Sequence, residues 1–108
     1  MKEDNVYLQN IFECIVKIET YTKSGKEGFM SSDLIQDAVI RNLEIIGEAT
    51  KRVSQEIKEL HQEIPWRQMA GLRDVLIHDY MGISHKVVWN VIQNELPKLK
   101  INIIELLN

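Results

Sequence analysis

The sequence contains few of the residues that break helices, form cross-links or bind metals. It has two prolines, five glycines and one cysteine among 108 residues. So few turn-forming residues do not suit the many short strands of a β-sandwich or β-barrel, and they predict an all-helical chain. The single cysteine, Cys14, excludes an intramolecular disulfide, and no Cys/His spacing typical of a zinc site is present. This cysteine usage is typical of a reducing compartment, so we expect a cytoplasmic protein.

The chain also lacks a long apolar run and an excess of basic residues. No hydrophobic stretch has the roughly 18 residues that a membrane span needs, and the residues after Met1 do not resemble a secretory signal, so no membrane contact is expected. Thirteen lysines and arginines against sixteen acidic residues give a net charge of −3. A broad basic surface for nucleic acid is therefore excluded, and any RNA contact must be local. The length predicts one domain over residues 1–108.

Apolar residues recur at the three- and four-residue spacing of helices along most of the chain. This spacing predicts a first helix over about residues 5–22 and a long second helix over residues 32–53, with Ser32 as its N-cap. Residues 23–29 (KSGKEGF), between these two helices, are predicted to form a loop. A short helix is expected from Ser54 to about His61.

Two further helices are predicted in the second half of the chain. One begins at Pro65 and ends between Tyr80 and Gly82, where glycine can adopt a left-handed cap. Ser84 is the expected N-cap of the last helix, which Pro97 should kink or split. Together, the apolar stripes predict an all-α fold, an antiparallel up-and-down bundle of four to five helices.

Polar residues interrupt the apolar stripe of the predicted second helix. Arg41 and Glu48 lie seven residues apart on one face, which fits either a solvent-exposed pair or part of a buried polar site. Asn42 lies in the stripe itself, so it needs a hydrogen-bonding partner. Trp66 and Trp89 are expected to pack in the core rather than to stack on bases.

The most unusual stretch is GLRDVLIHDY at residues 71–80, which places charged residues and a histidine at one helix end. Asp74 and His78 are four residues apart, so the carboxylate can orient the imidazole and raise its basicity. Arg73 and His78 are five residues apart, which separates them by about 140° around a straight helix. Either the helix breaks before His78, or the two side chains meet across a subunit interface.

On residue types alone, such a cluster is more often a surface patch of ion pairs than an active site. The sequence has no phosphate-binding glycine loop, no HExxH or GxSxG motif and no acidic cluster at metal-binding spacing. We therefore expect neither a metal nor a cofactor.

The segment RDVLIHDY resembles the R-x-x-x-x-H-x-Y signature of the HepT-like branch of the HEPN superfamily. The similarity extends over nearly the whole chain, and every residue of the signature is present. It implies the HEPN fold as a homodimer, in which two signatures line a cleft between the subunits. Three further segments resemble the second, third and fourth helices of that family in order and spacing: AVIRNLEIIGEA (38–49), IPWRQMAGLRD (64–74) and VVWNVIQNELPKL (87–99).

The resemblance also implies an activity and a partner. HepT-like proteins are typically metal-independent endoribonucleases that form the toxin half of a type II-like toxin–antitoxin module. The antitoxin is an MntA-type minimal nucleotidyltransferase, which silences the toxin by AMP transfer to the signature tyrosine, and the two proteins form a larger hetero-oligomer. In this sequence, the resemblance gives Arg73 and His78 the catalytic positions. Asp74 is a third candidate catalytic residue, at the polar position after the arginine where family members vary between Asn, Asp and His. Tyr80 takes the modified position.

RNA cleavage without a metal uses the substrate's own 2′-hydroxyl as the nucleophile. An imidazole can move the protons and an arginine can bind the phosphate, so these residue types suit the reaction. The main alternative is a non-catalytic helical module that docks a nucleotidyltransferase, and a further one is the antidote of such a module. The complete Arg73 and His78 pair and the tyrosine favour the ribonuclease.

Overall fold

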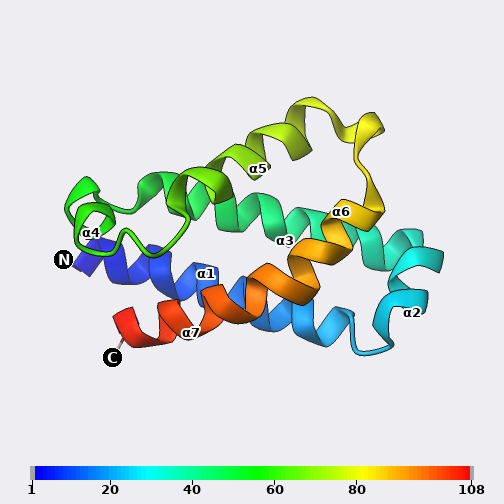
Figure 1. Cartoon of the computed structure of the whole chain (residues 1–108), viewed down its shortest axis with the longest axis horizontal. Coiled ribbons are helices and arrows are strands. Elements are labelled where there is room, and N and C mark those ends of the chain that lie inside the picture. Colours follow the sequence, from blue (N-terminus) through cyan, green and yellow to red (C-terminus); the bar gives the residue numbers. More distant parts are fainter. Residues whose placement is uncertain (1, 108) are drawn as a thin grey trace.

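The computed structural model describes residues 2–107, and these residues run back and forth as antiparallel helices (Figure 1). Short helices occupy the connections, and no described residue belongs to a strand, so the all-α prediction is confirmed. No helix among these residues is long and apolar enough to cross a membrane. The elements are α1 (Lys2–Tyr21), α2 (Gly25–Ser31), α3 (Asp33–Arg52), α4 (Gln55–Leu60), α5 (Trp66–His78), η1 (Tyr80–Gly82), α6 (His85–Asn90), η2 (Val91–Glu95) and α7 (Leu96–Leu107).

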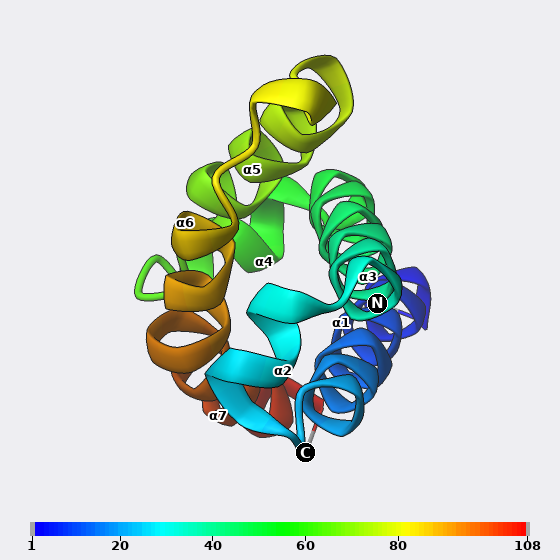
Figure 2. The same cartoon turned by 90° about the vertical axis from the view of Figure 1, so that its right-hand side faces the viewer.

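The helix α3 is the centre of the bundle. It packs against α1 on one side and α5 on the other, and α7 packs against α1. Figure 2 shows α1 and α3 facing the stretch formed by α6 and α7, with α5 at the upper edge. On α1, Ile11, Ile15 and Ile18 are fully buried. Burial of one such side chain contributes about 1.5–3 kcal/mol, so these apolar stripes stabilise the predicted bundle.

Serine side chains begin three helices at the positions predicted. Each serine hydroxyl accepts a hydrogen bond from the backbone N–H three residues later: Ser32 from Ile35 (3.2 Å), Ser54 from Ile57 (3.3 Å) and Ser84 from Val87 (3.4 Å).

A buried carboxylate joins the start of α1 to the start of α4. Asp4 is almost fully buried and accepts hydrogen bonds from the backbone N–H (2.7 Å) and the hydroxyl (2.8 Å) of Ser54.

The loop predicted for residues 23–29 is wrong, because residues 25–31 form the helix α2. Gly25 has a φ of 83°, which lets the chain turn sharply into this helix. Phe29 is fully buried, and its ring centroid lies 5.6 Å from that of Trp89. The side chain of Gln36 donates to the carbonyl of Phe29 (3.0 Å). Packing against distant residues therefore stabilises a helix whose own sequence is too short to show periodicity.

The aromatic and helix-end predictions have mixed outcomes. The core position of Trp66 is confirmed, since its side chain is buried. The left-handed cap predicted at Gly82 is wrong, because α5 ends at His78 and, among the described residues, Gly25 is the one glycine with positive φ. The predicted interruption near Pro97 is present as the π-helical turn η2, where the N–H of Leu96 donates to the carbonyl of Val91.

Candidate active site

The helices α3 and α5 approach each other closely where Gly47 lies beside Arg73. A Cβ atom on Gly47 would overlap the Cβ of Arg73 and would lie 3.0 Å from the carbonyl oxygen of Met69. Glycine inside a helix is about 1 kcal/mol less favourable than alanine. The close approach explains why Gly47 is present within the 20-residue helix α3. It also fixes the position of the Cβ of Arg73, from which the side chain extends.

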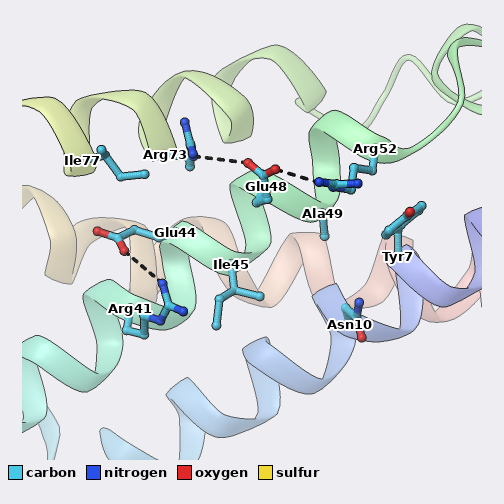
Figure 3. A pocket seen from close by; sticks show the side chains of 10 residues that line it. All are labelled: Tyr7, Asn10, Arg41, Glu44, Ile45, Glu48, Ala49, Arg52, Arg73 and Ile77. Carbon is cyan, nitrogen blue, oxygen red and sulfur yellow. Dashed lines mark ion pairs between the residues drawn. The ribbon is translucent and has the colours of Figure 1, made fainter.

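Two carboxylates hold the guanidinium of Arg73. Its Nε lies 3.4 Å from Oε2 of Glu48, and its Nη1 donates to Oδ1 of Asp74 at 3.1 Å. Figure 3 shows Arg73 on α5 reaching the Glu48 carboxylate on α3. The side chain is 26% exposed, so it is anchored yet open to solvent. Among the described residues, its Nη2 donates no hydrogen bond, which leaves a donor edge for a ligand.

Asp74 bridges Arg73 and a lysine from α3. Its Oδ1 accepts a hydrogen bond from Nζ of Lys51 at 2.6 Å, in addition to the one from Arg73. These two bonds, that from Lys51 first, hold the pKa of Asp74 below its ordinary value. The predicted contact between Asp74 and His78 is wrong: in the part of the chain that the structure describes, no hydrogen bond or ion pair joins them. The Asp74 carboxylate is instead bound by two cations, Lys51 and Arg73.

His78 is the last residue of α5, and it is exposed. This end of α5 projects from the bundle, as both cartoon views show (Figures 1 and 2). Because α5 is helical up to His78, the alternative in which the helix breaks before this residue is excluded. Arg73 and His78 are thus about 140° apart around the axis and about 7.5 Å apart along it. Within one chain, the two side chains leave α5 on different sides.

Tyr80 follows two residues after His78. Its backbone begins η1, but its side chain lies outside the described residues. Its predicted role as the modified residue therefore stays a prediction.

A pocket of about 280 Å³ adjoins Arg73 between α1, α3 and α5 (Figure 3). Arg41 and Glu48 both line it, but each pairs with another residue: Arg41 Nη1 lies 3.8 Å from Oε1 of Glu44, and Glu48 Oε1 lies 3.5 Å from Nε of Arg52. Glu48 is thus part of a half-exposed polar site and not a partner of Arg41. The pocket is lined by Tyr7, Asn10, Arg41, Glu44, Ile45, Glu48, Ala49, Arg52, Arg73 and Ile77.

Among the residues that the structure describes, the hydrogen-bonding partner that Asn42 needs is present for only one of its two polar side-chain atoms. The amide nitrogen of Asn42 donates to the carbonyl of Ala38 at 2.9 Å, whereas its buried oxygen has no partner among the described residues. Within the same described part of the chain, no three His, Cys, Asp or Glu side chains are grouped as metal ligands.

Neither Gly47 nor Lys51 was predicted from the sequence to belong to this cluster. A glycine in the middle of a strongly periodic helix is a signal of close approach that could have identified Gly47. Nothing in the local pattern marks Lys51, since its partner Asp74 is on another helix.

Comparison with known proteins supports the family that the sequence resembles. The profile of the family described as Ribonuclease HepT-like matches residues 11–106. The probable ribonuclease HepT of Thermococcus cleftensis is 47% identical over 95 residues, which cover 87% of this chain and 86% of that protein. A protein of Caldanaerobacter subterraneus subsp. tengcongensis, named as a candidate RNase, is 39% identical over 108 residues, which cover 99% of this chain and 96% of that protein.

A third relative is longer than this chain. It is a Methanocaldococcus jannaschii protein named as a γ-glutamylcyclotransferase and candidate RNase, and it is 43% identical over 107 residues. The match covers 98% of this chain but 48% of that protein, so the chain spans about half its length. No solved structure matches the chain significantly. On the family profile and these relatives, the chain belongs to the HepT-like ribonuclease family.

Proposed function

We propose that this protein is a metal-independent endoribonuclease and the toxin of a toxin–antitoxin module. The observation that carries the proposal is the arrangement on α5. The Arg73 guanidinium is held by Glu48 and Asp74 with a donor edge open to solvent, and an exposed His78 ends the same helix. The names of the relatives in Thermococcus cleftensis and Caldanaerobacter subterraneus support RNA as the substrate.

In the proposed reaction, the 2′-hydroxyl of one nucleotide attacks the adjacent phosphorus. One His78 imidazole accepts the 2′-hydroxyl proton, and a second His78 donates a proton to the 5′-oxygen as the bond from phosphorus to that oxygen breaks. Arg73 binds the non-bridging phosphate oxygens, which carry the developing charge. The products are a 2′,3′-cyclic phosphate and a 5′-hydroxyl. Asp74 and Glu48 do not touch the substrate; they position Arg73.

This mechanism requires two subunits. Arg73 and His78 leave α5 on different sides, so a two-fold dimer that pairs the projecting ends of α5 would combine groups from both chains. Exposed apolar side chains beside His78 support such a contact: Val75 is 54% exposed, Ile77 42% and Met81 94%. We expect a dimer in sedimentation velocity at micromolar concentration. A monomer under those conditions would contradict the shared site.

The proposed partner is an MntA-type nucleotidyltransferase antitoxin that transfers AMP to Tyr80. Tyr80 lies two residues beyond His78 on the backbone of η1. A modification there would bring a phosphodiester and a nucleoside close to the position where the RNA phosphate must bind.

The reaction itself is tested with purified protein and a defined RNA strand. We expect cleavage in the presence of EDTA, with a 2′,3′-cyclic phosphate on the 5′ fragment by mass spectrometry. A matched strand with a 2′-O-methyl group at the cleaved nucleotide should be resistant, because it lacks the nucleophile. Loss of activity in EDTA, or cleavage of the methylated strand, would contradict the mechanism.

A further inference from the structure

A second, larger hollow lies beside the C-terminal end of α3. It has a volume of about 840 Å³ and is bounded by α4, the connection to α5 and the first turns of α5. We call it the α4–α5 groove. Its floor offers no aromatic platform, since the one aromatic residue that lines it, Trp66, is buried with 7% of its surface exposed.

The α4–α5 groove is locally basic in a protein whose net charge is −3. Three cations line it, namely Lys51, Lys58 and Arg67, against one carboxylate, Glu63. That carboxylate lies 3.5 Å from Nδ1 of His61. In the described part of the chain, neither Lys58 nor Arg67 forms an ion pair, so both charges are available to a polyanion.

The groove leads toward Arg73. Arg67, Ala70 and Asp74 follow one another at three- and four-residue spacing, so they share one face of α5. Arg67 and Ala70 line the groove, and Asp74, at the end of this face, binds both Lys51 (2.6 Å) and Arg73 (3.1 Å). A strand lying along this face therefore passes from the basic groove to the guanidinium within about 9 Å along the helix.

The polar lining suits a nucleic-acid backbone better than bases. Besides the cations, the side-chain amides of Gln55, Gln62 and Gln68 line the groove. Amide and cationic side chains typically contact phosphate and sugar, and these contacts position a strand without reading its sequence. A stacking surface, which sequence-tolerant binding of bases would need, is not offered by the buried Trp66.

We propose that the α4–α5 groove binds the ribose–phosphate backbone of the RNA strand next to the cleaved bond, with Lys58 and Arg67 contacting phosphates. This inference rests on the proposed ribonuclease function and adds the surface that holds the substrate. It also explains how an acidic protein binds RNA, because the basic contacts are confined to one groove beside the reactive residues.

The test measures binding separately from cleavage. The probe is a fluorescein-labelled, fully 2′-O-methylated single-stranded RNA of mixed sequence, which cannot be cut by the proposed reaction. Fluorescence anisotropy at several salt concentrations is compared for the wild type, for Lys58→Gln/Arg67→Gln and for Lys26→Gln/Lys98→Gln. The last variant changes the net charge equally at exposed lysines on α2 and α7, outside the groove.

We expect the groove variant to bind at least tenfold more weakly than the wild type at low salt. The slope of log K for probe binding against log salt concentration should be shallower by about 1.4 in this variant. Two phosphate contacts are lost, and each contact with a single strand contributes about 0.7 to the slope. The control variant should stay within about twofold of the wild type with an unchanged slope. Circular dichroism confirms that each variant is folded.

The two proposals fail in different ways. The groove proposal is wrong if the groove variant keeps the wild-type affinity and salt slope, or if the control variant loses as much affinity for the probe as the groove variant does. This conclusion holds whether or not the wild type cleaves unmodified RNA. If the wild type binds the probe through the groove but does not cleave unmodified RNA, the ribonuclease proposal is wrong and the groove assignment to a nucleic-acid backbone stands.

Discussion

Gly47 on α3 lies so close to Arg73 on α5 that the Cβ of any other residue at position 47 would overlap the Cβ of Arg73. The position of the guanidinium therefore depends on the separation of two helices as well as on its ion pairs.

Gly47→Ala is expected to displace α5 and Arg73. Overpacking at a close contact typically costs about 1–3 kcal/mol of stability, of which the better helix propensity of alanine offsets about 1 kcal/mol. Because small displacements of a catalytic group can cost up to about 10²-fold, we expect kcat/KM to fall by at least about tenfold. The variant is compared by thermal unfolding and RNA cleavage.

Gly71→Ala is the matched control. Gly71 also lies within a helix of the site, but a Cβ there would meet no atom within 4 Å. We expect a gain of about 0.5–1 kcal/mol in stability and unchanged cleavage. Equal activity of the two variants would show that the contact between Gly47 and Arg73 does not set the position of the guanidinium.

The pKa of Asp74 should depend on Lys51. The hydrogen bonds from Lys51 and Arg73 favour the ionised carboxylate and hold its pKa below 3.8. This pairing therefore contributes stability above the unfolded-state pKa near 3.8, and the contribution is lost as the pH falls from there through the lower folded-state pKa. Lys51→Met should raise the pKa of Asp74 toward 3.8, as followed by NMR titration of the carboxyl carbon.

Lys100→Met provides the reference for that titration. Lys100 pairs with Glu19 at 2.9 Å on another part of the bundle, so its loss should leave the pKa of Asp74 unchanged. An Asp74 pKa that is the same in the Lys51 and Lys100 variants would contradict the assigned pairing.

Most helix positions could be predicted because they depend on local patterns. Ser32, Ser54 and Ser84 are caps recognisable from the residues that follow them. The helix α2 could not be predicted in this way, because its Phe29 is buried by Trp89, which lies on a helix near the other end of the sequence. The left-handed cap at Gly82 is absent because α5 ends earlier, at His78, and Gly82 belongs to the 3₁₀ turn η1.

The site was predictable only in part. The resemblance gives Arg73 and His78 as the proposed catalytic residues, but the spacing of Asp74 and His78 suggested a local pair that does not form. The reason is physical: Lys51 approaches Asp74 from α3, and a nearby ammonium competes for the carboxylate with the imidazole. Ion pairs between two helices, including that of Glu48 with Arg73, cannot be predicted from the spacing of residues within one helix.

Tyr80→Phe should separate cleavage from silencing. The phenol has no part in the proposed reaction, so at least partial ribonuclease activity should remain. In the wild type, AMP on Tyr80 would repel the RNA phosphate by about 2 kcal/mol at a separation of about 8 Å and an effective dielectric constant near 20. With the nucleotidyltransferase and ATP, intact-mass analysis should show AMP on the wild type and none on the variant, which stays active. A modified and silenced Tyr80→Phe would exclude this residue as the acceptor.

The proposed ribonuclease site is tested by RNA cleavage with His78→Ala and Arg73→Ala, with His85→Ala as the control. His85 begins α6 beside the ring of Phe29 and lines neither the pocket beside Arg73 nor the α4–α5 groove. We expect His78→Ala to lose about 10² to 10⁴ in rate, Arg73→Ala a comparable amount, and His85→Ala almost nothing, with all three variants retaining the helical circular dichroism signal. Arg73→Lys should recover little, because an ammonium cannot reproduce the planar fork of the guanidinium. Cleavage at the wild-type rate by folded His78→Ala would contradict the proposed role of His78 in moving the protons of the reaction.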